Sequence, residues 1–146
     1  MRALLVMASS ALGAAIGAPL AAWASPAQDY VLYCQGCHGP QAQGVAGKVP
    51  PLAGALALFM RSAAGRDYVM RVPGAANSAL SDARLAAVLN WVAITFNNGQ
   101  ALEAAPFSTA EVSQARHQPL ASVLAARRAV VRALAASGAA APAESY

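Results

Sequence analysis

The chain has 146 residues, a formal net charge of +4, 58% hydrophobic residues and only two cysteines. Its basic residues are scattered rather than grouped, so no nucleic-acid-binding surface is indicated. The high hydropathy reflects an apolar N-terminus and many alanines, and it does not argue for a membrane-spanning body.

The first 24 residues have the features of a secretory signal peptide. Arg2 supplies a positive charge, an apolar stretch runs from 3 to about 20, and Ala22-Trp23-Ala24 matches the A-x-A cleavage pattern. A retained membrane anchor is the alternative, because about 20 apolar residues are needed to cross a bilayer. We expect cleavage after Ala24 and export to the periplasm, with membrane association only if the leader is retained.

The remaining chain is expected to be all-α, since no stretch alternates with period two. Helices are predicted over 28–35, 55–61, 65–72, 81–96, 108–117 and 119–137. Glycines and prolines predict a loop over 36–54. We expect a domain at 25–98, a C-terminal helical extension at 99–137 with one apolar stripe from Leu120 to Leu134, and a disordered alanine-rich tail at 138–146.

The two cysteines and one of the two histidines form the sequence Cys34-Gln35-Gly36-Cys37-His38. Cys-x-x-Cys-His is the attachment sequence for c-type haem. Two thiols one helical turn apart can each form a thioether with one vinyl group, and the adjacent histidine then binds the iron. A zinc site would need about four ligands, and a thioredoxin-like dithiol would need a βαβ context. Haem c is therefore the expected cofactor, one per chain.

At this point the sequence resembles the class I cytochromes c. The resemblance rests on CQGCH, on the loop ending in Pro50-Pro51-Leu52, and on the helix LSDARLAAVLNWV over 80–92. It implies a small helical domain around one haem, with His38 as the iron ligand. It also implies that a proline carbonyl, of Pro50 or Pro51, accepts the Nδ1–H of His38, and we assign Pro51 to the cofactor site. The resemblance implies that the first helix crosses the last core helix through Tyr30, Tyr33, Trp91 and Phe96.

The sixth iron ligand is the weakest part of this resemblance. The family supplies a methionine from the loop before the last core helix, and residues 75–78 contain none. We assign Met70 as the metal ligand, with Met60, His117 and an open position as alternatives. An open position would make the iron accessible to small ligands.

The expected function is one-electron transfer rather than catalysis. The partners would be redox proteins, namely a periplasmic dehydrogenase, an oxidase or another cytochrome, with Lys48, Arg61, Arg66 and Arg71 at the docking face. The acidic residues are too dispersed for an active site. The alternative is a five-coordinate ligand-binding or sensing haem protein, or a dedicated haem subunit of a dehydrogenase complex.

Overall fold

The computed structural model describes residues 24–144. The predicted leader therefore lies almost entirely outside the described residues. The helices are α1 (Pro26–Tyr33), α2 (Gln35–His38), α3 (Ala55–Phe59), α4 (Ala63–Arg71), α5 (Pro73–Ala76), α6 (Asp82–Thr95), α7 (Thr109–Ala115) and α8 (Val123–Ala136). Within residues 24–144 there is no strand, only an isolated bridge between Val45 and Val49. The predicted all-α class is confirmed.

Local capping explains where the helix boundaries differ from the predicted ones. α1 begins at Pro26 because Ser25 and Gln28 form a reciprocal capping box. α4 ends at Arg71, just before Pro73 as expected, and Pro73 then occupies the first turn of α5, where its missing N–H costs nothing. α8 begins at Val123 rather than at Pro119, since Ser122 caps its N-terminus.

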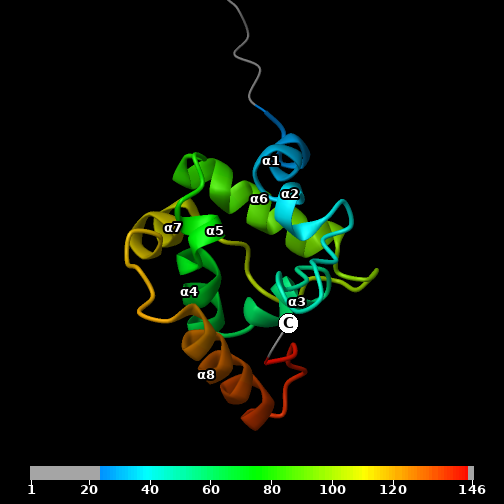
Figure 1. Cartoon of the computed structure of the whole chain (residues 1–146), viewed down its shortest axis with the longest axis vertical. Coiled ribbons are helices and arrows are strands. Elements are labelled where there is room, and N and C mark those ends of the chain that lie inside the picture. Colours follow the sequence, from blue (N-terminus) through cyan, green and yellow to red (C-terminus); the bar gives the residue numbers. More distant parts are fainter. Residues whose placement is uncertain (1–23, 145–146) are drawn as a thin grey trace, which may run out of the picture.

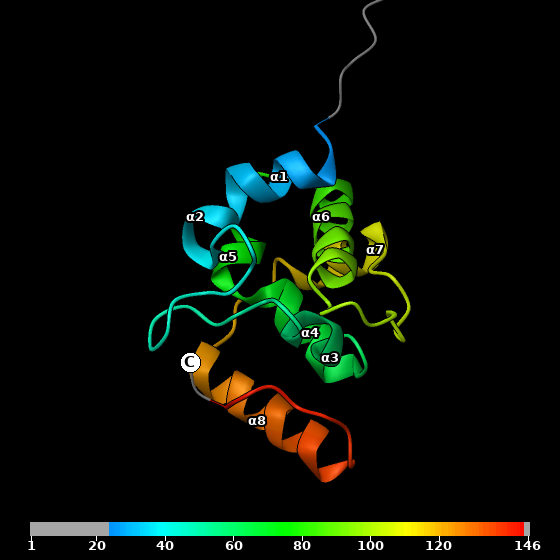
Figure 2. The same ribbon diagram turned by 90° about the vertical axis from the view of Figure 1, so that its right-hand side faces the viewer.

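The crossing of α1 and α6 forms one end of the molecule (Figures 1 and 2). The Tyr30 ring packs 5.6 Å from Trp91 and 5.3 Å from Phe96, centroid to centroid. Beside them, buried Asp29 is paired with Arg84, and Arg84 Nε lies 3.1 Å from Asp29 Oδ2. The predicted aromatic crossing is confirmed for three residues, whereas Tyr33 is 41% exposed.

The C-terminal extension packs against its own domain. α7 lies against α6 and α4, and α8 lies against α4 at the end of the molecule opposite α1 (Figures 1 and 2). The predicted stripe is buried at Val130, Val131 and Leu134. Burial of such a stripe supplies most of the stability of an amphipathic helix, so the extension is an integral layer of the fold.

Arg61, Arg66 and Arg71 were assigned to a docking face, but each of them contacts the C-terminal extension instead. Arg66 donates to both carboxylate oxygens of Glu111, at 2.9 and 2.8 Å, and to Ala105 O at 2.7 Å. Arg71 donates to Gln118 O at 2.7 Å, and Arg61 pairs with Glu103. The guanidinium groups of Arg61 and Arg66 thus hold the segment between α6 and α7, and that of Arg71 holds the segment between α7 and α8, rather than presenting a free charged surface.

The segment after α8, expected to be disordered, folds back along that helix (Figure 2). Arg127 donates to Ala143 O at 2.9 Å, and Arg132 Nε lies 3.0 Å from Glu144 Oε1. These contacts order the segment up to Glu144, the last residue described.

The ion pair between Arg66 and Glu111 predicts an acid-sensitive attachment of the extension. Arg66 lowers the pKa of Glu111 from 4.5 to about 2. The stabilisation is thus present at neutral pH and is lost as the pH falls from about 4.5 towards 2. Because Glu111 is 38% exposed, we expect Glu111→Gln to cost only about 1 kcal/mol at pH 7. Denaturant unfolding at pH 7 and pH 2.5 should show this difference shrinking with acid.

Glu103→Gln is the matched control, because the Glu103 side chain is 69% exposed in its pair with Arg61. We expect a smaller effect at both pH values. A Glu111→Gln effect that is equally large at pH 7 and pH 2.5 would contradict the assignment.

Candidate haem-binding site

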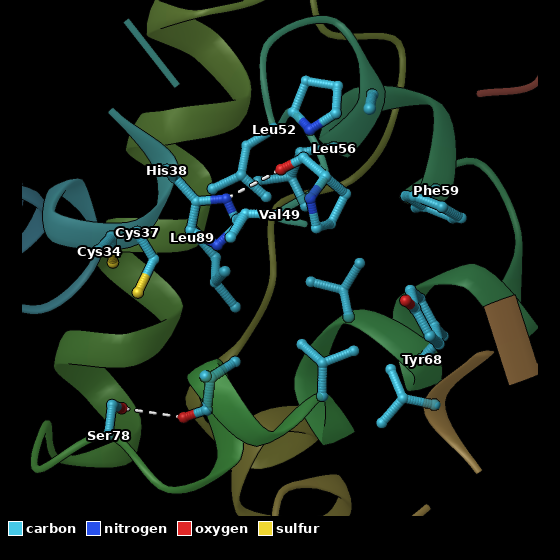
Figure 3. Close-up of a pocket in the computed structure, with 18 of the residues that line it drawn as sticks. Cys34, Cys37, His38, Val49, Leu52, Leu56, Phe59, Tyr68, Ser78 and Leu89 are labelled. Atoms are coloured by element: carbon cyan, nitrogen blue, oxygen red, sulfur yellow. Dashed lines mark hydrogen bonds between the residues drawn. The ribbon is translucent and has the colours of Figure 1, made fainter. Parts of the chain in front are cut away.

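The cysteine motif forms a single tight turn at the end of α1. The Cys34 N–H still bonds to Tyr30 O at 2.9 Å, which ends α1. The N–H groups of Cys37 and His38 then bond to Cys34 O at 3.2 and 3.0 Å, which forms α2. Both thiols are free and lie at the same edge of a cavity (Figure 3). This is the placement that two thioether bonds to one porphyrin edge require.

The His38 ring is oriented by the loop that follows it. Its Nδ1 lies 3.0 Å from Pro50 O (Figure 3), so Nδ1 donates and Nε2 is left to bind a metal. The carbonyl belongs to Pro50, whereas the sequence-based assignment to the cofactor site names Pro51. Pro51 does line the cavity, but no hydrogen bond joins it to His38 in the part of the chain that the structure describes.

Glycine at position 44 allows the loop to reach His38. Gly44 N donates to His38 O at 2.8 Å, and its φ is +69°. A Cβ here would lie 2.4 Å from Val49 O and 2.7 Å from the carbonyl carbon of Pro50. Only glycine combines this backbone conformation with so close an approach. The position of the Pro50 carbonyl therefore depends on Gly44.

Burial sets the protonation states of the motif. Burial lowers the pKa of His38, and the hydrogen bond to Pro50 opposes this shift. The imidazole is thus kept in the neutral form that binds metals. Burial, followed by the charges of Asp29 and Cys37, raises the pKa of Cys34 to about 11. At neutral pH the Cys34 side chain is a thiol before the cofactor is attached.

The cavity has a volume of about 290 Å³ and lies between α3, α4, α6, α8 and the Pro50 loop. Its walls are mainly apolar, with Leu52, Leu56, Phe59, Val69, Val72 and Leu89 among the residues that line it. An apolar cavity with two thiols and a neutral imidazole at one side fits a covalently held haem, whose faces are apolar. The residues present thus match the cofactor that the motif predicts.

The cavity wall before α6, which was expected to supply the sixth iron ligand, contains no methionine or histidine among the described lining residues. The residues of this segment that line the cavity include Gly74, Ala75 and Ser78. Met70 is buried, at 4% exposure, but it does not line the cavity, whereas its neighbours Tyr68 and Val69 do.

The other candidate ligands also lie away from this wall. Met60 borders a separate depression beside Glu103, and His117 is exposed. Among residues 24–144, His38 is the only histidine or methionine that lines the cavity. The assignment of Met70 therefore stays a prediction without support from its position.

Sequence reasoning missed two polar residues of the cavity, Tyr68 and Arg127. A signal for Arg127 was present, because it lies three residues before Val130 and four after Val123, within the apolar stripe of α8. A charged residue on a buried helix face is rare unless it is paired.

The described chain offers neither a clustered metal site nor a membrane-spanning helix. Between residues 24 and 144, no group of three or more histidine, cysteine, aspartate and glutamate side chains is arranged to hold a metal ion. In the same range, no helix has the length and apolarity needed to cross a bilayer.

The chain belongs to the c-type cytochromes. It is 32% identical over 116 residues to cytochrome c-552 of Thermus thermophilus, an alignment that covers 65% of this chain and 88% of that protein. A second cytochrome c-552, from a particular strain of Thermus thermophilus, shows the same 32% identity, with 78% of its length covered. No protein-family model matches. As a c-type cytochrome the chain carries covalently bound haem c and is an electron-transfer protein rather than an enzyme.

Proposed function

We propose that this chain is a periplasmic monohaem electron carrier of the class I type. Cys34 and Cys37 would attach the haem, and His38 would bind its iron. The observation that carries this proposal is the His38 Nδ1 to Pro50 O contact at the edge of an apolar cavity that also presents both thiols. The bound haem would supply an iron that gains and loses one electron.

The residues of this chain would keep the site rigid and largely dry. Pro50 holds the His38 ring, and Gly44 holds the Pro50 loop against it. Leucine, valine and phenylalanine side chains exclude water from the cavity, which lowers the local dielectric constant and tunes the potential. A rigid, apolar surrounding leaves little to rearrange when the charge of the iron changes.

The partners proposed are redox proteins of the periplasm, namely a dehydrogenase, an oxidase or another cytochrome. Cys37 is exposed at the cavity edge, and Val31, Leu32 and Tyr33 are 56%, 69% and 41% exposed immediately before the motif. Lys48 is exposed and also lines the cavity. Transient redox contacts are small, so the exposed side chains of Val31, Leu32 and Tyr33, together with the cation of Lys48, would suffice for such a contact.

A second candidate function is the binding of small ligands at an open sixth position. It is favoured by the cavity wall before α6, where Gly74, Ala75 and Ser78 offer no soft ligand. The two candidates differ in whether Met70 or an exchangeable molecule completes the iron coordination.

Absorption spectra of the haem-loaded protein test the proposal. We expect covalent haem that is reversibly reduced and reoxidised by one electron. Met70 as ligand predicts a low-spin oxidised spectrum that Met70→Ala converts to high spin. An open position predicts a high-spin wild type, insensitive to Met70→Ala, whose reduced form shifts on adding carbon monoxide.

Met60→Ala is the matched control, because Met60 is equally buried but borders a different depression. It should leave the spectra unchanged. A chain that attaches no haem when the c-type maturation machinery is present, or whose haem cannot be cycled, would overturn the electron-carrier assignment.

A further inference from the structure

The cavity side opposite His38 is made of unusually small residues. His38 and the loop residue Val49 lie along the upper side of the cavity in Figure 3, and Ser78 lies along the lower side. Gly74 and Ala75 line the cavity with Ser78. A Cβ at Gly74 would have no neighbour within 4 Å. This side therefore leaves room for a small molecule next to the haem.

The described residues of this side carry no charge. The helices and turn around it contribute Val69 and Val72 in addition to the small residues. The lysine and arginine that line the cavity belong to other elements, since Lys48 lies in the loop after the motif and Arg127 lies on α8. A charged ligand would lose its hydration here without gaining an opposite charge, whereas a small neutral molecule would not.

Ser78 supplies a hydroxyl group that can turn towards a bound molecule. Its Oγ donates to Ala75 O at 2.9 Å, and the Ser78 N–H donates to the same oxygen at 3.2 Å. Ala75 O therefore keeps a hydrogen-bond partner when the hydroxyl turns away, and no polar group is left unsatisfied. The Ser78 hydroxyl can thus donate to a molecule in the cavity at little cost.

The C-terminal extension holds Met70 away from this side of the cavity. Met70 is 4% exposed and lies on a face of α4 that does not line the cavity. Two arginines of α4 are attached to the extension, Arg66 to Glu111 at 2.8 Å and Arg71 to Gln118 O at 2.7 Å. Rotating α4 far enough to bring Met70 to the haem would break both attachments.

We propose that a neutral diatomic gas, rather than Met70, binds at the sixth position of the iron, in the space beside Gly74 and with the Ser78 hydroxyl as its hydrogen-bond donor. The inference rests on the proposed attachment of haem at Cys34 and Cys37. Carbon monoxide and nitric oxide are gases of this class. Because they bind reduced iron more tightly than oxidised iron, an occupied site holds the protein in its reduced form. The gas then controls whether this carrier releases its electron.

Carbon monoxide added to the reduced, haem-loaded protein tests the site. We expect the wild type to bind it, and Met70→Leu, which nearly conserves side-chain volume, to bind it equally well. A hydrogen bond from Ser78 lowers the C–O stretching frequency, so Ser78→Ala should raise this frequency in the infrared spectrum. Ser78→Ala should also weaken carbon monoxide binding about two- to tenfold, the effect of one lost hydrogen bond. Ser78→Thr retains the hydroxyl and should restore both values.

Ser137→Ala is the matched control. Ser137 Oγ also donates to a carbonyl three residues earlier, Leu134 O at 2.7 Å, but Ser137 is not among the described residues that line the cavity. Its carbon monoxide complex should match that of the wild type.

Three results would decide against the inference or the proposed function. Identical stretching frequencies and affinities for Ser78→Ala and the wild type would overturn the inference. Haem that is attached and cycles by one electron, but binds carbon monoxide only after Met70→Leu, would also overturn it and leave the electron carrier intact. This comparison decides the inference even if Ser78→Ala does not fold. A wild type that attaches no haem would instead overturn the proposed function.

Discussion

Replacing Cys34 and Cys37 together with alanine is expected to abolish covalent haem attachment. The two thiols lie one turn apart at the cavity edge, with the Cys37 N–H bonded to Cys34 O at 3.2 Å, and they are the only cysteines of the chain. No other side chain can form the thioethers. Haem staining of a denaturing gel, after expression with the c-type maturation machinery, should show no band for the double variant.

Gly36→Ala is the matched control within the same turn. A Cβ at Gly36 would have no neighbour within 4 Å, and both thiols stay in place. We expect a haem-stained band of wild-type intensity. A stained band that survives the double cysteine change would refute the assignment of the motif as the attachment site.

Replacing Arg116 with alanine is expected to cause a large loss of stability, about 3 kcal/mol, because several hydrogen bonds to a charged group are lost at once. Arg116 is 8% exposed. It donates to Ala76 O at 3.0 Å, Ser78 O at 2.8 Å, Leu80 O at 2.8 Å and Asp82 Oδ1 at 2.9 Å. One guanidinium from the extension thus holds the whole segment between α5 and α6. Denaturant unfolding of the haem-loaded protein measures the loss.

The same change should loosen one wall of the haem cavity. Arg116 bonds to Ser78 O and to Ala76 O, next to Ala75, and both Ser78 and Ala75 line the cavity. We therefore expect carbon monoxide to bind the reduced Arg116→Ala variant faster than the wild type. Arg128→Ala removes an exposed arginine of α8 and serves as the control, with an effect within about 0.5 kcal/mol. An Arg116→Ala loss no larger than that of the control would contradict the role of Arg116.

Much of the fold was predictable from short stretches of sequence. Ser81 before Asp82 and the apolar repeat through Val92 specified α6, and Ser108 with Glu111 specified the capping box of α7. Such signals act over three or four residues, where backbone geometry fixes which side chains meet. The short helix α2 was missed because Gly36 interrupts its pattern, although its one turn is what separates the two cysteines.

The cofactor was also determined by the sequence itself. Covalent attachment of haem needs two thiols and an imidazole within five residues, and the stretch from Cys34 to His38 has this spacing. The sequence did not determine whether Pro50 or Pro51 accepts the hydrogen bond of His38. Both prolines have a carbonyl, and only the path of the loop decides which one faces His38.

The roles of the arginines were decided only by the tertiary structure. Arg116 meets residues 34 to 40 positions earlier in the chain, and Arg127 meets Phe59 across 68 positions of sequence. A long, flexible cationic side chain has the same composition and local pattern whether it is solvated or buried. Only the packing of α7 and α8 against the haem domain determines which arginines become structural and which one reaches the cofactor site.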